Sequence, residues 1–236
     1  YVPAANQRAM DKIATLKADA LIIDLEDSAL PDQKEAARQA AQQALNNRTT
    51  KVTLGLRINA LDTDYFDADL ALLASAAPDF LVLPKVESAQ TIAHVAQSFK
   101  GPIWAMIEAP SGVLAAPEIA ASSPQMQALL LGLEDLAKEL DIEALPNRAN
   151  LSYAMRAVVL AAKAHGLLAI DGVYKNLSDQ SGFEQQCLQA RQLGFDGKSL
   201  IHPKTIDPCN RCFSPSADQI AKAQAIIQAF EQAQSM

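Results

Sequence analysis

The regular alternation of short apolar segments with longer helical segments is the feature that most constrains how this chain folds. The apolar segments have the length and the Val, Ile and Leu content of strands, and the segments between them have the Ala, Gln, Glu and Lys content of helices. This alternation is typical of a parallel sheet covered by helices. The predicted strands are 1–3, 20–25, 52–58, 80–84, 103–107, 128–133, 168–173 and 198–201, and the clearest predicted helices are 34–45, 88–98, 154–165, 184–193 and 217–233.

Eight strand–helix units in a chain of 236 residues match the size of a TIM (β/α)8 barrel. A doubly wound open sheet is the alternative architecture for the same alternation. No change of composition and no Gly/Ser-rich linker divides the chain. We therefore predict an α/β fold with one TIM-barrel domain spanning residues 1–236.

The composition limits the class of partner. The net charge is −7 and the pI is about 5.0, whereas nucleic acids and anionic membranes attract basic surfaces, so we expect a small-molecule partner and neither of those two. No segment reaches the roughly 18 apolar residues of a membrane span. Three cysteines are too few for a disulfide framework in a chain of this size, which predicts a reducing compartment, by default the cytoplasm.

Polar residues appear where seven of the eight predicted strands end. A single charge at a strand end is usually a helix cap or a solvated loop residue, but this repetition is difficult to assign to chance. In a TIM barrel these positions meet at the carboxyl-terminal face, where active sites lie. The residues concerned are Asp24, Glu26, Asp27, Arg57, Lys85, Glu87, Glu108, Glu134, Asp135, Asp171 and His202.

The segment "GPIWAMIEAP" places Glu108 at the end of an otherwise apolar strand. A buried carboxylate needs a partner, and several carboxylates in one mouth repel each other unless a cation lies among them. Glu108 and Asp135 follow consecutive strands, so their oxygens are placed to share one hard ion, Mg²⁺ or Mn²⁺, completed by water and substrate. Zinc is a weaker prediction, because Cys209 and Cys212 have no second pair and no histidine at zinc spacing.

Arg57 is the one arginine at a predicted strand end. Its planar guanidinium fits a two-point contact with a substrate carboxylate. The alternative for the same residue is an ion pair with a neighbouring acid.

Six motifs in a fixed order carry a family resemblance that covers nearly the whole chain. They are "DLED", "RIN", "LPKVES", "IEAPSG", "GLEDL" and "GFDGKSLIHP", and "YVPAANQRAM" at the start and "FSPSADQIAKA" near the end extend the match. Together they resemble the citrate lyase β-subunit-like branch of the HpcH/HpaI aldolase superfamily. Any one of the motifs alone is a weak signal, but the ordered set is specific.

The resemblance implies a Mg²⁺-dependent TIM-barrel lyase that cleaves a carbon–carbon bond in a citryl, malyl or citramalyl thioester of CoA or acyl-carrier protein. It implies that Glu108 and Asp135 are metal ligands, and that Arg57, Glu108 and Lys85 contact the substrate. It also implies a homo-oligomer, expected to be a trimer. Catalytic roles fall to Arg57 and to the acids of "DLED", with Glu26 and Asp24 as candidate bases through water and Asp171 as a third candidate.

Two departures from the family pattern concern the ends of the chain. Many members begin "FVPGN", whereas this chain has Ala4, Ala5 and Asn6 at the corresponding place, so contacts to the thioester carrier are expected to differ. Several CoA-dependent relatives continue into a C-terminal lid segment, and we expect this segment to be absent from a chain that ends at Met236.

Two other functions remain open from the sequence. One is a metal-dependent pyruvate aldolase of the same superfamily acting on free 2-oxo-4-hydroxy acids. That branch usually carries an early histidine base, and the first histidine here is His94. The other is a low-turnover subunit or binding protein of a larger lyase complex.

Overall fold

The computed structural model describes residues 1–48 and 51–234, and in this part of the chain eight strands form one parallel sheet. Each strand pairs with the strands before and after it in the sequence, in the order β1 to β8. The strands are β1 Val2–Pro3, β2 Ala20–Asp24, β3 Thr53–Arg57, β4 Phe80–Leu83, β5 Ile103–Ile107, β6 Met126–Leu131, β7 Leu168–Asp171 and β8 Gly197–Lys198.

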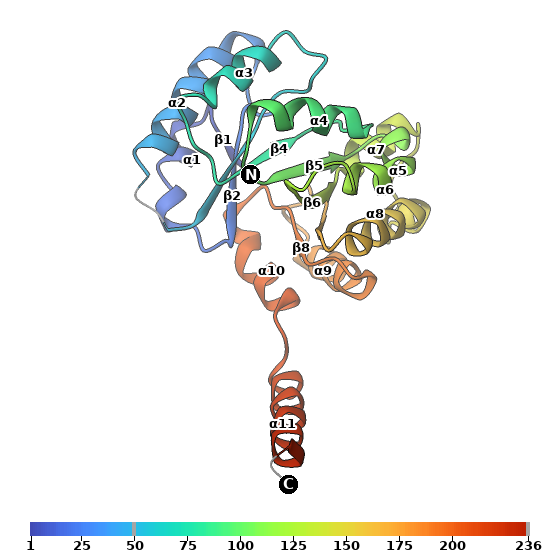
Figure 1. Cartoon of the computed structure of the whole chain (residues 1–236). Coiled ribbons are helices and arrows are strands. Elements are labelled where there is room, and N and C mark those ends of the chain that lie inside the picture. The colour runs from blue at the N-terminus through green and yellow to red at the C-terminus, as the bar shows by residue number, and fades with distance from the viewer. Residues whose placement is uncertain (49–50, 235–236) are drawn as a thin grey trace.

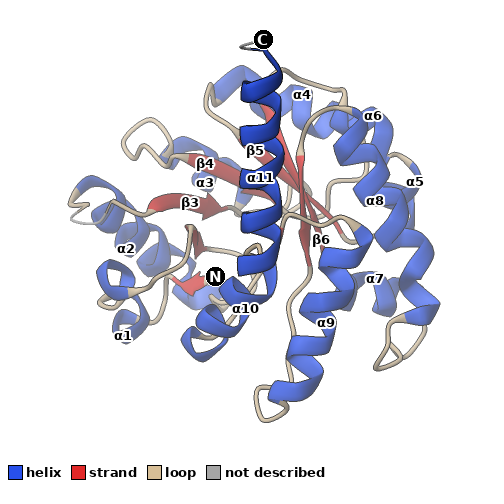
Figure 2. Ribbon diagram, turned by 90° about the horizontal axis from the view of Figure 1, so that it is seen from below, coloured by secondary structure: helices blue, strands red, loops and turns tan. Residues whose placement is uncertain are grey.

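Helices lie around the outside of the curled sheet, as Figure 2 shows. The helices are α1 Gln7–Met10, α2 Lys34–Asn46, α3 Phe66–Leu72, α4 Ala89–Ser98, α5 Pro110–Leu114, α6 Ala116–Ala120, α7 Leu133–Glu139, α8 Ser152–Ala164, α9 Gln180–Leu193, α10 Ile206–Phe213 and α11 Ala217–Gln234. The last of these projects away from the rest of the molecule (Figure 1). Within the described residues, no helix has the length and apolar character needed to cross a bilayer.

The predicted α/β fold with eight parallel strands is confirmed, but the sheet is an open, curled half-barrel. The strand order excludes the doubly wound alternative, in which the order reverses part-way across the sheet. In the described residues the ladder ends at β8, and β8 does not pair with β1. The two edges are nevertheless close, because the amino group of Tyr1 donates a hydrogen bond of 2.6 Å to the carbonyl of Leu200.

The predicted boundaries fail mainly where an apolar run continues from a strand into a helix. The strand predicted at 128–133 begins earlier, at Met126, and ends at Leu131, because Gly132 turns the chain and Leu133 already begins α7. The strand predicted at 198–201 is also wrong at its end, since β8 stops at Lys198. The five predicted helices are all present, each with bounds within four residues of the prediction.

Alternation along β5 explains why an apolar strand ends in a glutamate. Trp104 and Met106 belong to the cluster inside the curl of the sheet, while Ile103, Ala105 and Ile107 pack with the helices outside it. The strand period of two therefore directs the next inward position, Glu108, to the carboxyl-terminal end of the interior. The buried members of the inner cluster are Ile22, Phe80, Val82, Met106, Ala128 and Leu130.

Gly55 makes room for the aromatic pair at the centre of this interior. The rings of Phe80 and Trp104 stack with their centroids 4.1 Å apart, and Phe80 is only 1% exposed. A Cβ atom on Gly55 would lie 2.3 Å from the Phe80 ring. The Phe80 ring on β4 therefore requires a residue without a side chain at position 55 on β3.

Gly55→Ala is expected to lower the free energy of unfolding by roughly 1–3 kcal/mol, because the new Cβ would overlap the Phe80 ring, which is buried and stacked on Trp104. Gly101→Ala is the matched control, since its new Cβ would meet the ring of Phe99, which is only partly buried and can turn toward solvent. Urea unfolding of both variants measures the difference. Equal losses of stability in the two variants would contradict the packing requirement.

Candidate active site

A cavity of about 310 Å³ lies at the carboxyl-terminal ends of the strands. It is smaller than a mainly apolar cavity of about 570 Å³ at the seam between β1 and β8, but it contains most of the predicted charged groups. Its walls come from the ends of β2, β3 and β5 and from the loops after β6, β7 and β8. The polar residues that line it are Asp24, Asp27, Ser28, Arg57, Glu108, Glu134, Asp135, Lys175 and Ser199.

Asp24 and Arg57 form a buried two-point ion pair at the base of this cavity. They are register partners on β2 and β3, so their side chains point to the same face. Nε and Nη2 of Arg57 donate to the two carboxylate oxygens of Asp24 at 2.6 and 2.8 Å. Burial raises the pKa of Asp24, but the hydrogen bonds and charge of Arg57 outweigh burial and hold that pKa below its ordinary value.

The two-point face of Arg57 is therefore already occupied by Asp24 in this structure. The third nitrogen, Nη1, lies 2.8 Å from Oε2 of Glu26 and 3.8 Å from the sulfur of Met106. The ring of Tyr1 covers the guanidinium at 4.7 Å. The predicted contact with a substrate carboxylate would use Nη1, which the sequence pattern alone does not indicate.

Glu108 is held at the interior end of β5 by one backbone hydrogen bond and by a missing side chain. Its Oε1 accepts a hydrogen bond of 2.7 Å from the backbone N–H of Lys85, which has a left-handed backbone (φ 50°). A Cβ on Gly132 would lie 2.5 Å from Oε2 of Glu108, so only glycine leaves room for the carboxylate. Burial, followed by the charges of Glu26 and Asp135, raises the pKa of Glu108 to about 7.

Glu26 carries a buried oxygen, Oε2, that forms an ion pair with Arg57 but accepts no hydrogen bond from the described residues. Its Oε2 is close to Nη1 of Arg57, but their geometry makes no hydrogen bond, and no other described group bonds to this atom. Burial raises the pKa of Glu26 to about 7, helped by Asp27 and Asp24 and opposed by Arg57. An unsatisfied buried oxygen usually indicates a missing water, ion or ligand, or a catalytic role.

A divalent cation fits this arrangement of carboxylates. Glu108 and Asp135 line the same cavity, and the charge of Asp135 helps to raise the pKa of Glu108. Among the described residues, no three acidic, histidine or cysteine side chains surround one point closely enough to form a metal site by themselves. An ion at Glu108 and Asp135 would therefore complete its shell with water and substrate, as Mg²⁺ commonly does.

Two lysines bring positive charge to the carboxylates. The Nζ of Lys85, half exposed, lies 3.7 Å from Oε1 of Glu26, and Lys175 pairs with Glu134 at 2.7 Å at the edge of the cavity. Burial lowers the pKa of Lys85, but Glu26, Glu108 and Asp135 outweigh it and raise that pKa overall. Lys175 was not predicted from the sequence, although it follows the strand predicted at 168–173 by two residues, as Asp135 follows the strand predicted at 128–133.

Lys34 is a second lysine that was not predicted from the sequence, and it supports the backbone of the "DLED" turn. Lys34 is buried at the start of α2 and donates 2.7 Å hydrogen bonds to the carbonyls of Leu25 and Glu26. It also donates to the side chain of Asn59 at 2.6 Å, and Asn59 in turn bonds Asp69. These contacts fix the backbone that carries Glu26. The only sequence signal is a lysine spaced eight residues after Glu26.

Five predicted strand-end residues do not line this cavity: Glu26 and Lys85, which pair with each other, and Asp171, His202 and Glu87. Asp171 is fully buried, and its oxygens accept hydrogen bonds from Arg148 at 2.8 Å and Lys198 at 2.7 Å, so neither oxygen is free to act as a base. His202 lines the larger cavity and accepts a hydrogen bond from the N–H of Lys204. Glu87 is exposed and accepts a hydrogen bond from the hydroxyl of Ser111.

Comparison with known proteins shows the family to which the chain belongs. Residues 1–203 match the family model of HpcH/HpaI aldolase/citrate lyase proteins. The chain belongs to this family. It is 39% identical over 236 residues to a (3S)-malyl-CoA thioesterase of Cereibacter sphaeroides, an alignment that covers 99% of the chain and 82% of the relative. It is 32% identical over 246 residues to citrate lyase subunit beta of Escherichia coli K12, with the same coverage.

Solved structures of the family are also similar to this chain. CitE from Mycobacterium tuberculosis, in complex with magnesium, acetoacetate and coenzyme A, superposes with a TM-score of 0.83 at 31% identity, covering 98% of this chain and 85% of that one. RipC from Yersinia pestis gives a TM-score of 0.80 at 35% identity, covering 88% and 94%. These likenesses confirm the predicted resemblance to the citrate lyase β-subunit-like branch of the HpcH/HpaI superfamily.

Glu108→Gln tests the cost of the buried charge in metal-free protein. Because the pKa of Glu108 is raised from 4.5 to about 7, the folded protein keeps a proton in this range that the unfolded chain loses. The stability of the wild type therefore falls, relative to the variant, as pH rises through this range. We expect the variant to be more stable by roughly 1–3 kcal/mol at about pH 8 and equally stable near pH 4.

Urea unfolding in the presence of a chelator measures this difference. Glu118→Gln is the control, because Glu118 is exposed on α6. Mg²⁺ is expected to stabilise the wild type at about pH 8 and to leave Glu108→Gln nearly unchanged. Parallel pH curves for wild type and Glu108→Gln would contradict a costly buried charge at this position.

Proposed function

We propose that this protein is a Mg²⁺-dependent carbon–carbon lyase that cleaves a 3-hydroxyacyl thioester into an acetyl thioester and a 2-oxo acid. The acyl group is of the citryl, malyl or citramalyl type, carried by CoA or by acyl-carrier protein. The observation that supports this function most is that Glu108 and Asp135 line one cavity together with the buried Arg57. Buried Glu26 lies against that arginine and, like Asp135, adds to the negative charge around Glu108. Citrate lyase subunit beta and Mg²⁺-bound CitE are relatives by sequence and structure.

Glu108 and Asp135 would hold the Mg²⁺ ion, with Mn²⁺ as the alternative. Both lie in the cavity, and Glu108 is directed to it by its bond to the Lys85 backbone and by the space above Gly132. When bound, the ion acts as a Lewis acid for the hydroxyl and carboxylate oxygens of the substrate. Its charge would also relieve the repulsion that raises the pKa of Glu108.

Arg57 orients the substrate carboxylate through Nη1, while Asp24 holds the rest of the guanidinium in place. Asp24 is in this proposal a positioning residue rather than a base, since both of its oxygens bond Arg57. Lys85 lies at the rim, half exposed, and adds positive charge near the carboxyl groups of the substrate. A preorganised charge of this kind typically contributes a few kcal/mol to catalysis.

Glu26 is the proposed general base. Its buried Oε2 is free of hydrogen bonds, and a pKa of about 7 suits proton transfer near neutral pH. The base takes the proton of the substrate hydroxyl, and the oxygen electron pair forms the carbonyl of the 2-oxo acid. The adjacent carbon–carbon bond breaks, its electrons pass to the thioester fragment as an enolate, and the methylene carbon takes up a proton to give the acetyl thioester.

Thioester hydrolysis is the second candidate reaction. Sequence identity favours this reaction, because the (3S)-malyl-CoA thioesterases are 39 to 40% identical to this chain. The citrate lyase beta subunits are 31 to 34% identical to it. In that reaction water attacks the thioester carbonyl, and the products are a hydroxy acid and a free thiol. The same cavity can bind the substrate for either reaction, so the products decide between them.

Product analysis with malyl-, citramalyl- and citryl-CoA tests the proposal. In the presence of Mg²⁺ we expect equal amounts of a 2-oxo acid and acetyl-CoA and no free CoA. Asp135→Ala should lower turnover by roughly 10–100-fold or more through lost metal affinity, because it removes a ligand. Glu139→Ala, on the exposed end of the same helix, is the matched control and should keep full activity.

Other product patterns would contradict the lyase. Free thiol without 2-oxo acid identifies the thioesterase reaction instead. Tight thioester binding without either product identifies a low-turnover subunit or binding protein. Cleavage of free 2-oxo-4-hydroxy acids in preference to thioesters identifies the pyruvate aldolase.

The domain, the closed barrel and the location are part of the same proposal. We propose that residues 1–236 form one TIM-barrel lyase domain, supported by the barrel order of the strands and by the Tyr1–Leu200 hydrogen bond across the open seam. The cytoplasm is the proposed location, since the described cysteines are free thiols.

We also propose that the protein is a homo-oligomer, with a trimer as the expected state, in which α11 packs against another copy. Helix α11 has no buried residue and extends from the body in Figure 1. Its large apolar side chains Ile220, Ile226, Ile227 and Phe230 are 44 to 64% exposed. At helical spacing they occupy one face, and such a face usually packs against another surface.

Replacing Ile227 and Phe230 together with glutamate is expected to dissociate the oligomer to monomers, because it places two charges on the proposed contact face. The matched control replaces Ala225 and Gln228 together with glutamate, since these exposed residues have the same spacing on the opposite side of α11. The control should leave the assembly intact. Sedimentation velocity at micromolar concentration measures both. A wild-type monomer, or an unchanged assembly in the first double variant, would contradict the proposed packing.

A further inference from the structure

All three cysteines of the chain gather at one place, away from the proposed active site. Cys187 lies on α9, and Cys209 and Cys212 lie one turn apart on α10. Cys187 and Cys209 form a buried cluster with Phe183, against which Cys212 also packs. Residues separated by more than twenty positions in the sequence thus place their thiols on a shared interface between two helices.

Cys187 is the centre of this thiol cluster. It packs with Cys209 in this buried cluster, and Cys212 packs against the same cluster. The two helices are further held together by Arg191 on α9, which donates a hydrogen bond of 2.9 Å to the carbonyl of Cys212. Cys187 and Cys209 therefore lie together in one buried interface of the folded protein.

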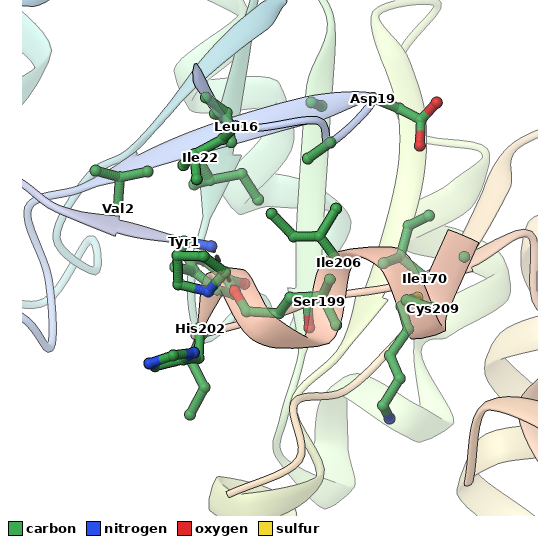
Figure 3. A pocket seen from close by; sticks show the side chains of 18 of the residues that line it. Tyr1, Val2, Leu16, Asp19, Ile22, Ile170, Ser199, His202, Ile206 and Cys209 are labelled. Atoms are coloured by element: carbon green, nitrogen blue, oxygen red, sulfur yellow. Dashed lines mark hydrogen bonds between the residues drawn. The ribbon is translucent and has the colours of Figure 1, made fainter. Parts of the chain in front are cut away.

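The larger cavity gives a small molecule access to one of these thiols. Cys209 lines the cavity of about 570 Å³, whereas Cys187 does not. Figure 3 shows Cys209 on α10 near Ile170 and Ile206, at the wall of this cavity. Cys187 is completely buried behind it. A reagent that enters the cavity thus meets Cys209 first.

The surroundings of the two sulfurs differ in a way that separates their roles. Cys209 lines the cavity, whereas Cys187 is 0% exposed, so Cys209 is the thiol that an oxidant in the cavity reaches and Cys187 is the thiol that resolves the product. The neighbouring thiol of Cys187 and the ammonium of Lys198 lower the pKa of Cys209 against the cost of burial, which favours the reactive thiolate at the same residue.

We propose that Cys209 and Cys187 form a peroxide-reactive pair that closes to a reversible disulfide between α10 and α9. The Cys209 thiolate attacks one oxygen of a hydroperoxide, the O–O bond breaks, and the other oxygen leaves as hydroxide or alkoxide, which takes up a proton. The sulfur of Cys187 then attacks the resulting sulfenic acid of Cys209 and releases water. Two thiols are oxidised by two electrons, and one hydroperoxide is reduced.

This site is independent of the proposed lyase activity, because none of its residues lines the carboxylate cavity. The disulfide would join α9 directly to α10, the helix that follows β8. In this proposal only one cysteine of the "CNRC" segment, Cys209, takes part in the disulfide. Its partner, Cys187, is distant in the sequence.

Hydrogen peroxide in small excess, added to the full chain at neutral pH, tests the pair. After quenching and unfolding, a thiol titration is expected to fall from three thiols to one, and peptide mapping should find a bond between residues 187 and 209 that a dithiol reductant reverses. Cys187→Ser should stop the reaction at a sulfenic acid on Cys209, detected as its dimedone adduct. Cys212→Ser is the matched control and should form the disulfide at the wild-type rate.

Three results would overturn the proposal. One is a bond between residues 209 and 212, or between 187 and 212, as the main product. Another is formation of a disulfide in Cys209→Ser as fast as in the wild type. The last is retention of all three thiols, or their direct conversion to sulfinic and sulfonic acids without any disulfide.

Discussion

The burial of excess negative charge at the carboxyl-terminal end of the sheet is the constraint to which the rest of the site responds. Glu26 and Glu108 are both buried, and both have pKa values raised to about 7. Arg57 compensates mainly Asp24, with which it forms two hydrogen bonds, and so leaves the glutamates short of positive charge. A site that buries carboxylates at such an electrostatic cost is suited to bind a cation and a substrate whose charges remove that cost.

The scaffold maintains this costly arrangement through backbone contacts rather than through further charges. The N–H of Lys85 fixes one oxygen of Glu108, and the missing side chain of Gly132 leaves room for the other. Lys34 fixes the turn that carries Glu26 by bonding two of its carbonyls. These supports come from three different strand–helix connections, which is why a parallel sheet with neighbouring strands in chain order suits the site.

The two cavities of the molecule have different chemical characters. The smaller one is charged and lies over the strand ends, where the proposed cleavage occurs. The larger one lies along the open seam, has a mainly apolar lining and includes Cys209. Tyr1 lines both, and its ring covers the guanidinium of Arg57. The seam and the charged site therefore share a wall, although their proposed chemistries are separate.

The sequence by itself determined the strand–helix alternation, the parallel sheet and the set of charged strand ends, because strand periodicity and apolar runs are local properties. It also indicated Glu108, since a carboxylate stands at the end of an otherwise apolar strand. Only the tertiary structure decided that the guanidinium of Arg57 bonds Asp24 and that Asp171 accepts hydrogen bonds from Arg148 and Lys198. The contact between Cys187 and Cys209 was likewise decided by the tertiary structure. These outcomes depend on register and on helix packing between segments far apart in the chain, and no local pattern encodes which distant partner a charged or thiol group will meet.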